Sequence, residues 1–402
     1  MSIGELSRTR LNRMHDVMQR YVERGTVPGL ITLVSRRGEV FVDAVGSRTL
    51  GGRDPMRRDA IFRISSMTKP VTAVAAMVLV EECRLRLDDP IDGFLPELAD
   101  RQVLKLPDSP LDDTVPAERQ LTLRDLLTQR LGFGAVQATA DSTPIQRAVR
   151  EHRLDTPARP SVVPAPDTWI RHLGSLPLMY QPGDRWMDDT GSDVLGVLIA
   201  RVSGQPLDAF MRERVFAPLG MIDTGFTVPA SKQDRFTTGY VTDTGTGALQ
   251  PYDPAVGGEW SRPPAFPSGA VGLVSTIDDY LAFGQMLLSF GKYGRQRVLS
   301  RPSIEAMTTD QLTSAQKSRS GWAEGAFDSQ GWGFGMAMAT RRTEPSHPVG
   351  SFGWDGGLGT SWRSDPREAM VSILMTPAAW GSPEPPAVCT DFRTLAYQAI
   401  DD

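Results

Sequence analysis

One stretch, residues 61–80, constrains the fold more than any other part of the chain. Residues 71–80 carry a single polar side chain, that of Thr72. Ten apolar residues are too few to cross a bilayer, so this run of good helix formers predicts a core helix buried on nearly every side. Pro70 lacks an N–H and is tolerated only in the first turn of a helix. The helix is therefore expected to begin about one turn upstream, near Ser66.

That helix start brings a serine and a lysine together. Residues three apart share a helix face, so the ammonium of Lys69 is within reach of the Ser66 hydroxyl. A serine hydroxyl becomes a nucleophile when a neighbouring base takes its proton, and burial lowers the pKa of a lysine because it disfavours the charged form. S-x-x-K is a signature of serine nucleophiles. The alternative is structural: the serine caps the helix and the lysine is exposed.

The charge balance of the chain bears on its partners. Its 43 basic and 48 acidic residues give a net charge of −5, which argues against nucleic acid as a partner. The N-terminal residues lack the apolar segment of a secretory signal, and no stretch has the length of a membrane span. Cys83 and Cys389 show no disulfide framework. We therefore expect a cytoplasmic protein without a membrane partner, and the oligomeric state cannot be inferred.

The order of the predicted elements indicates an α/β (α+β) fold. An amphipathic helix within residues 5–25 and a helix at 389–400 lie at the two ends of the chain. Strand-like segments lie just inside them, at residues 29–35, 39–45, 332–340, 359–364 and 368–375. We expect one antiparallel sheet built from both ends of the chain and flanked by the terminal helices.

The middle of the chain reads as short helices joined by long polar or proline-rich loops, including a surface loop over 241–268. The sheet domain is therefore expected to comprise residues 1–75 and 269–402, with a mainly helical insertion over 76–268. The active site is expected in the cleft between the two parts, where the core helix begins.

Two further motifs accompany the serine and the lysine. Residues 181–196, Q-P-G-D-R-W-M-D-D-T-G-S-D-V-L-G, form a turn that leads into a helix. Residues 350–362, G-S-F-G-W-D-G-G-L-G-T-S-W, are a glycine-rich entry to a strand. Glycines there allow the backbone to approach a ligand closely and direct an N–H at it. Taken alone, this second motif equally fits a hairpin with β-bulges.

Together the motifs resemble the serine β-lactamase and penicillin-recognising superfamily, in particular its class C and family VIII carboxylesterase branch. The resemblance covers about residues 25–375 and includes, in the family's order, S-S-M-T-K-P, P-G-D-R-W, A-P-L-G-M, G-L-V-S-T and W-D-G-G. It implies a β-lactamase/transpeptidase-like fold and a serine hydrolase without cofactor or metal. It also implies that Ser66 is the nucleophile, that Lys69 assists it, and that the N–H groups of Ser66 and Gly357 hold the oxyanion.

Trp354 occupies the position at which β-lactamases carry a lysine. The cation that would bind a β-lactam carboxylate is thus replaced, and the resemblance favours small carboxylic esters, with Trp354, Gly356, Gly357 and Thr190 as substrate-binding residues. Two alternatives stay open. One is a β-lactamase or D-amino-acid peptidase or amidase on the same fold, and the other is a non-catalytic binding protein.

The second motif departs from the family at Asp188, where members carry a tyrosine that serves as base or proton relay. The reference pKa of an aspartate is about 4, against about 10 for a phenol, so at neutral pH it accepts a proton but hardly donates one. Beside Lys69 it would also raise the pKa of that lysine. Asp188 is therefore predicted either to act directly as the base or to mark an impaired site. Tyr180 and Tyr252 are candidate substitutes, although no spacing argument places either one there.

Other chemistry-bearing residues indicate no second site. Four histidines are scattered without zinc-ligand spacing, and His347 is expected in a surface loop. The acids around Asp188 lack the glycine and glutamate spacing of a calcium loop. Four aromatic residues are candidates for an acyl pocket, or else for the core: Trp186, Trp260, Phe266 and Trp354.

Overall fold

The computed structural model describes residues 6–135, 142–154, 159–321 and 325–401. At its centre is a seven-stranded antiparallel sheet in the order β11-β12-β13-β14-β15-β1-β2. The strands come from both ends of the chain: β1 (Gly29–Arg36), β2 (Glu39–Gly46), β11 (Gln330–Trp332), β12 (Ala337–Ala339), β13 (Phe352–Gly356), β14 (Thr360–Asp365) and β15 (Met370–Met375). The predicted fold class and the predicted origin of the sheet are confirmed.

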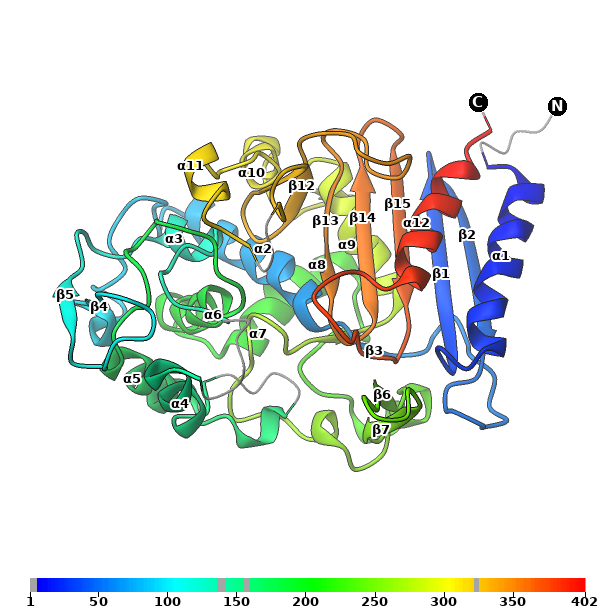
Figure 1. Cartoon of the computed structure of the whole chain (residues 1–402). Helices are drawn as coiled ribbons and strands as arrows, with labels where there is room; N and C mark the ends of the chain where they lie inside the picture. Colours follow the sequence, from blue (N-terminus) through cyan, green and yellow to red (C-terminus); the bar gives the residue numbers. More distant parts are fainter. Residues whose placement is uncertain (1–5, 136–141, 155–158, 322–324, 402) are drawn as a thin grey trace.

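Helices cover both faces of this sheet. The terminal helices α1 (Arg8–Glu23) and α12 (Ala387–Gln398) lie side by side on one face, in blue and red in Figure 1. The other face packs against α9 (Ile277–Leu288). Alternate side chains of β1 accordingly enter two separate cores, Leu30 with the terminal helices and Ile31 with α9. Burial on both faces explains why β1 is apolar along most of its length.

Helices and short two-stranded sheets dominate the chain between β2 and β11, much of it to one side of the sheet (Figure 1). The helices are α2 (Thr68–Glu81), α3 (Leu123–Leu127), α4 (Pro144–Glu151), α5 (Pro166–Ser175), α6 (Thr190–Ser203), α7 (Leu207–Met211), α8 (Ala217–Leu219), α9, α10 (Arg301–Met307) and α11 (Ser314–Lys317). The short sheets pair β3 (Phe62–Arg63) with β8 (Val274–Ser275), β4 (Gln102–Leu104) with β5 (Thr114–Pro116), β6 (Gly239–Thr242) with β7 (Leu249–Asp253), and β9 (Lys292–Tyr293) with β10 (Gln296–Arg297). The proposed division into domains stays a prediction.

The core helix begins where the sequence predicts. A 3-10 turn over Ser65–Met67 leads into α2 at Thr68, so Pro70 falls in the first helical turn. Every α2 residue up to Leu79 is buried, and no side chain caps its N-terminus. Each fully buried large apolar side chain contributes about 1.5–3 kcal/mol. Packing against the core, rather than capping, therefore fixes this helix.

Two of the predicted segments are wrong. Residues 332–340 do not form one strand, because Gly335 turns the chain between β11 and β12 with φ +79. A Cβ at Gly335 would also lie 2.9 Å from the Lys69 carbonyl oxygen, so this turn packs directly on α2. Residues 241–268 are not simply a surface loop, because they contain β7 and the buried side chains of Asp253 and Trp260.

Among the described residues, no single helix has both the length and the apolar composition to cross a membrane. Only a pair bent by 81°, Thr190–Ser203 with Leu207–Leu219, meets that test, by length and composition alone. Both cysteines are free: Cys83 is exposed just beyond α2, and Cys389 is buried in α12.

A buried ion pair anchors β3, the strand that leads into the turn before α2. The side chains of Arg63 and Asp253 are 3% and 1% exposed, and Arg63 Nε donates to the Asp253 carboxylate at 2.7 Å. The guanidinium also lies 4.0 Å above the ring of Phe236. Burial lowers the pKa of Arg63, although nearby Tyr252 and Asp253 oppose that shift. The pair ties β7 to the strand that precedes Ser66.

Replacing Asp253 with asparagine is expected to lower the free energy of unfolding by about 3–5 kcal/mol, because it leaves the Arg63 guanidinium buried without its counter-ion. Urea denaturation measures the change. Asp278→Asn is the matched control, because it breaks an ion pair with Arg58 in which the side chains are 44% and 55% exposed, and its cost should be about 1 kcal/mol or less. Equal losses in the two variants would contradict a stabilising role for the buried pair.

Candidate active site

Ser66 lies in the 3-10 turn ahead of α2, and this turn is held in a strained conformation. The hydroxyl of Tyr280, from α9, donates to the Met67 carbonyl oxygen at 2.8 Å. Ser65 adopts φ +46, a region that non-glycine residues seldom occupy. Such strain persists only where the surrounding structure imposes it, and it is concentrated at functional sites. The fold thus sets the position of Ser66 through its neighbours.

The end of β13 supports the same turn from the sheet side. Thr360 Oγ1 donates to the Ile64 carbonyl oxygen at 3.2 Å. A Cβ on Gly356 would collide with that same oxygen, so only glycine allows the strand to come this close. Gly356 is not among the residues that line the cavity described below. Gly356 therefore allows the end of β13 to pack directly against the turn that carries Ser66.

We expect Gly356→Ala to cost about 1–3 kcal/mol of stability through overpacking and to slow covalent labelling of Ser66 by about tenfold or more, because the turn is displaced. Thermal unfolding and the rate of fluorophosphonate labelling measure the two effects. Gly357→Ala serves as the stability control, because a Cβ there meets nothing within 4 Å. A normal melting temperature for Gly356→Ala would refute the close-approach argument.

Gly357 follows β13 and borders the cavity. The carbonyl oxygen of Gly356 accepts a hydrogen bond from Gly359 N at 2.9 Å. This carbonyl shares its peptide unit with the N–H of Gly357, and the two groups point in opposite directions in a trans peptide. Trp380 N additionally donates to the Gly357 carbonyl oxygen at 2.8 Å. The orientation of the Gly357 amide is therefore fixed, and its role as an oxyanion donor stays a prediction.

Lys69 is fully buried beneath Ser66 and makes three polar contacts. Its Nζ lies 2.7 Å from Ser66 Oγ, 2.6 Å from Asp189 Oδ1 and 3.1 Å from Asp188 Oδ1. The predicted meeting of hydroxyl and amine is confirmed, and the alternative of an exposed lysine is excluded. Burial by itself would lower the pKa of Lys69, but the two carboxylates outweigh it and the pKa is raised. Lys69 is therefore an ammonium that donates to Ser66.

Asp188 lies at the wall of the cavity together with Ser66. Its pKa is raised, first by burial and then by the neighbouring charge of Asp189, with Lys69 partly opposing the shift. The backbone around it is fixed by hydrogen bonds from Ala135 N to the Asp188 carbonyl oxygen (3.0 Å) and from Met187 N to Gln129 O (2.8 Å). A carboxylate with a raised pKa is a better proton acceptor than an ordinary aspartate.

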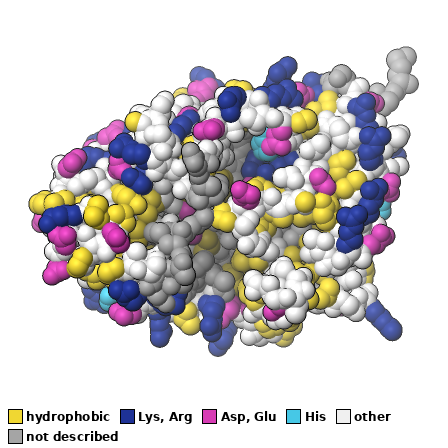
Figure 2. Space-filling view, in the orientation of Figure 1, with side chains coloured by type: hydrophobic (Ala, Val, Ile, Leu, Met, Phe, Trp, Pro, Cys, Tyr) yellow, Lys and Arg dark blue, Asp and Glu magenta, His cyan; other side chains and the backbone are white. Residues whose placement is uncertain are grey.

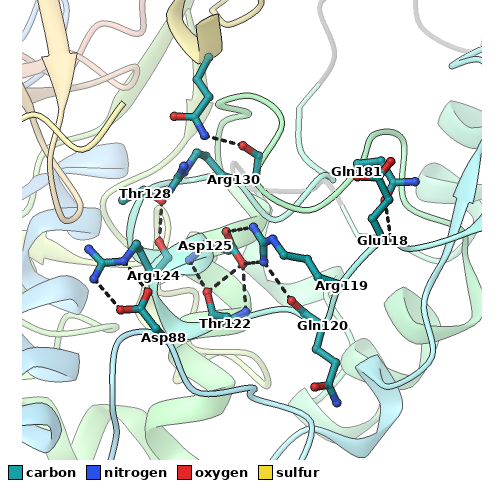
Figure 3. Close-up of polar contacts among 12 residues, drawn as sticks. Asp88, Glu118, Arg119, Gln120, Thr122, Arg124, Asp125, Thr128, Arg130 and Gln181 are labelled. Atoms are coloured by element: carbon teal, nitrogen blue, oxygen red, sulfur yellow. Dashed lines mark hydrogen bonds and ion pairs between the residues drawn. The ribbon is translucent and has the colours of Figure 1, made fainter. Parts of the chain in front are cut away.

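Figure 3 shows the polar contacts within and around α3, which supports the turn that precedes Asp188. Thr122 and Asp125 form a capping box at the start of α3, and Arg119 pairs with Asp125 through two hydrogen bonds of 2.6 and 2.8 Å. Beyond the end of α3, the carbonyl oxygen of Arg130 accepts from Gly183 N at 2.8 Å. The helix and its cap thereby hold the turn that precedes Asp188.

Sequence reasoning missed Asp189, although its carboxylate makes the shorter of the two contacts with Lys69. Adjacent side chains in regular structure point to different sides, so placing Asp188 in the tyrosine position gave no reason to expect its neighbour there too. The positive φ of Asp189, +71°, permits this arrangement. The residue types around it do not predict that conformation.

The cavity above Ser66 has a volume of about 640 Å³ and opens on the face that Figure 2 shows hollowed between the sheet and the helical part. One wall is aromatic, with Trp186 and Trp354 packed edge-on at 6.2 Å between ring centroids. Trp354 also stands perpendicular to Trp332 at 4.6 Å. Trp186 and Trp354 thus give this part of the cavity wall an aromatic, apolar surface.

The opposite part of the cavity wall is polar. Arg363 binds the Asp355 carboxylate through two hydrogen bonds of 2.8 and 2.7 Å, and Arg393 from α12 binds it as well. Burial would raise the pKa of Asp355, but the two guanidinium groups outweigh it and the pKa is lowered. His347 Nδ1 donates to the Glu344 carboxylate at 2.9 Å, and Arg363 Nε donates to His347 Nε2 at 3.2 Å. His347 lies in the loop between β12 and β13, as expected, but its side chain is only 17% exposed and lines the cavity.

The other predicted site residues separate into two groups. Tyr180 lines the cavity with Arg185 stacked 3.7 Å from its ring centroid, whereas Tyr252 lies away from the cavity near Arg63. Thr190 is buried at the start of α6 and does not line the cavity. Trp260 and Phe266 belong to the hydrophobic cores. In the described part of the chain, no group of three His, Cys, Asp or Glu side chains is arranged to hold a metal ion.

The fold and this site together define a serine hydrolase. The beta-lactamase family model matches residues 14–393, and the chain therefore belongs to the beta-lactamase family. Protein Rv1367c of Mycobacterium tuberculosis is 38% identical over 360 residues, which are 88% of this chain and 86% of that protein. Esterase EstB of Burkholderia gladioli is 28% identical over 395 residues, covering 92% of this chain and 90% of EstB.

A solved structure, that of EstCE1, superimposes with a TM-score of 0.79 at 25% sequence identity. The superposition covers 97% of this chain and 98% of the EstCE1 chain, and EstCE1 is described as a hydrolase with promiscuous acyltransferase activity. The resemblance drawn from the sequence motifs is thereby confirmed.

Proposed function

We propose that this protein hydrolyses small carboxylic esters through an acyl-enzyme on Ser66. The observation that carries the proposal is the contact of 2.7 Å between Lys69 Nζ and Ser66 Oγ at the floor of an open cavity. Ser66 Oγ attacks the ester carbonyl carbon, and the N–H groups of Ser66 and Gly357 stabilise the oxyanion. The leaving alcohol departs, and water then attacks the acyl-enzyme and releases the acid.

The proton follows the contacts of Lys69. As Ser66 Oγ bonds to carbon, its proton passes to Lys69 while Lys69 gives a different proton to Asp188. Lys69 is an ammonium before and after this step, and Asp188 changes from carboxylate to carboxylic acid. Asp188 then protonates the leaving alcohol, for which its place at the cavity wall suits it. The same transfers run again with water in deacylation.

The ester preference rests on the aromatic wall. Trp354 is 7% exposed, packs against Trp186 and Trp332 and lines the cavity, so an apolar side chain stands where a β-lactam carboxylate would need a cation. The names of EstB and EstCE1, an esterase and a hydrolase, support the same reaction class. A β-lactamase, or a D-amino-acid peptidase or amidase, on this fold stays the first alternative, and a non-catalytic binding protein the second. The cytoplasmic location likewise stays a prediction.

Wild-type protein is expected to form a covalent fluorophosphonate adduct on Ser66 and to hydrolyse p-nitrophenyl acetate and butyrate, whereas Ser66→Ala should do neither. Mass spectrometry of the intact protein and release of p-nitrophenol measure the two events. Nitrocefin is the comparison substrate, and hydrolysis of nitrocefin faster than of both esters would favour the β-lactamase alternative. Absence of any adduct on the wild-type serine would favour the binding protein.

The labelling rate is expected to fall as the pH is lowered through the pKa of Asp188, because only the ionised carboxylate accepts the proton. Burial and Asp189 raise that pKa, so the fall should lie above pH 4, the ordinary range of an aspartate. Asp188→Asn should abolish this limb of the profile and slow labelling by about 10²–10⁴-fold. Asp188→Tyr restores the family's residue, and a large gain in esterase rate there would instead mean that the native site is impaired.

A further inference from the structure

Asp189 is the central residue of a γ-turn. Its φ and ψ are +71° and −71°, and Thr190 N donates to the Asp188 carbonyl oxygen at 3.1 Å across it. The positive-φ form of the γ-turn is rare and strained, and it costs of order 1–3 kcal/mol when a residue other than glycine adopts it. Something in the site must therefore compensate for this conformation.

The γ-turn has a visible effect on the two aspartates. In strand or helix, consecutive side chains point to different sides, yet here both carboxylates reach the same Lys69 ammonium, at 3.1 Å from Asp188 and 2.6 Å from Asp189. The backbone N–H of Asp189 also donates to Asp188 Oδ1 at 2.9 Å and so orients that carboxylate. The strain of the γ-turn is thus offset by the ion pair that it allows, in which Asp189 is a second carboxylate beside the buried Lys69 ammonium.

We propose that Asp189 is the positioning residue of this site: its carboxylate holds Lys69 as a fixed ammonium whose remaining N–H bonds bridge Ser66 and Asp188. This inference rests on the proposed function, because it assigns Asp189 a part in that reaction. Unlike Asp188, Asp189 does not line the cavity, so it acts through Lys69 and not on the substrate.

The charge balance during the reaction explains why a second carboxylate is needed. When Asp188 takes up the proton, it becomes neutral, and a lone buried ammonium would be left without a counter-ion, which is strongly unfavourable. The Asp189 carboxylate, 2.6 Å from Lys69 Nζ, keeps the ammonium paired through this step.

The other charged group near this pair is directed elsewhere. Asp193, one turn along α6, accepts hydrogen bonds from Ser268 Oγ at 2.6 Å and Ala270 N at 3.1 Å. In the described part of the chain, Asp193 forms no hydrogen bond or ion pair with Lys69, whose ammonium is bound by Ser66, Asp188 and Asp189. Burial raises the pKa of Asp193 to about 7, and its charge acts on Asp189 and Lys69 only at longer range. Asp193→Asn therefore changes a buried carboxyl group of the same helix without removing a hydrogen bond from the ammonium.

The test compares Asp189→Asn and Asp189→Gly with Asp193→Asn. Asparagine tolerates positive φ and keeps an oxygen for Lys69 but loses the charge, whereas glycine removes the side chain and relieves the strain. We expect kcat for p-nitrophenyl butyrate to fall about 10–100-fold in Asp189→Asn and further in Asp189→Gly, with KM within about twofold. For Asp193→Asn, both kcat and KM should stay within about threefold of the wild-type values. A merely structural role would move KM and kcat together, in proportion to lost stability.

A second measurement reports on Lys69 directly. The chain contains only five lysines, so ¹³Cε-lysine NMR resolves them, and Lys69→Met assigns the signal. Wild-type Lys69 should titrate above 10.5, and Asp189→Asn should lower that midpoint by at least one pH unit while Asp193→Asn leaves it nearly unchanged. An unchanged midpoint in Asp189→Asn, or an unchanged kcat, would overturn the inference. Circular dichroism confirms that each variant is folded, and Asp189→Gly remains a test if the asparagine variant is not.

The two proposals fail in different ways. If wild-type protein forms no fluorophosphonate adduct and Asp189→Asn still lowers the Lys69 midpoint, the proposed hydrolysis is wrong, although Asp189 does fix the ammonium. If wild-type protein is labelled and Asp189→Asn matches it in rate and in Lys69 titration, the hydrolase proposal stands and the role of Asp189 is refuted.

Discussion

The site depends on one buried ammonium group. Lys69 has no exposed surface, and three oxygens satisfy its N–H groups: one from the serine and two from adjacent aspartates. Removing a cation from water is costly unless its partners are close and well oriented. The surrounding elements meet this demand, with the Gly335 turn packed on the Lys69 backbone and the Asp188 segment bound to the flank of α3. The geometry around Ser66 is thus a consequence of keeping Lys69 charged inside the protein.

The cavity above this ammonium has two chemically different sides. Tryptophan side chains form one side, and a network of compensated charges around Asp355 forms the other. Both guanidinium groups of that network already bind a carboxylate, so they offer less to an anionic ligand than their number suggests. A substrate with an apolar part and a neutral polar part would complement both sides. This agrees with an ester and gives no advantage to a free carboxylate.

Periodicity and proline placement were enough to predict α2, the sheet drawn from both ends of the chain, and the meeting of Ser66 with Lys69. Those features depend on local propensity and on burial, which residue types record. The hairpin at Gly335 and the cavity position of His347 were not predictable, because they depend on packing between distant segments. Asp189 was missed for a sharper reason: its γ-turn is imposed by the tertiary structure against the residue's own preference, as at many functional sites.

The pairing of β1 with β15 has a consequence for biosynthesis. Ile31 lies opposite Met375 in the central sheet, so a strand made early on the ribosome has to wait for one made near the end of translation. Contacts of such long sequence separation slow folding and leave apolar strands uncovered in the interval. The serine turn is synthesised early as well, whereas Gly356 and Gly357 arrive late. The serine turn and these two glycines can therefore come together only after nearly all of the chain has emerged from the ribosome, and the apolar strands of the sheet stay uncovered until then.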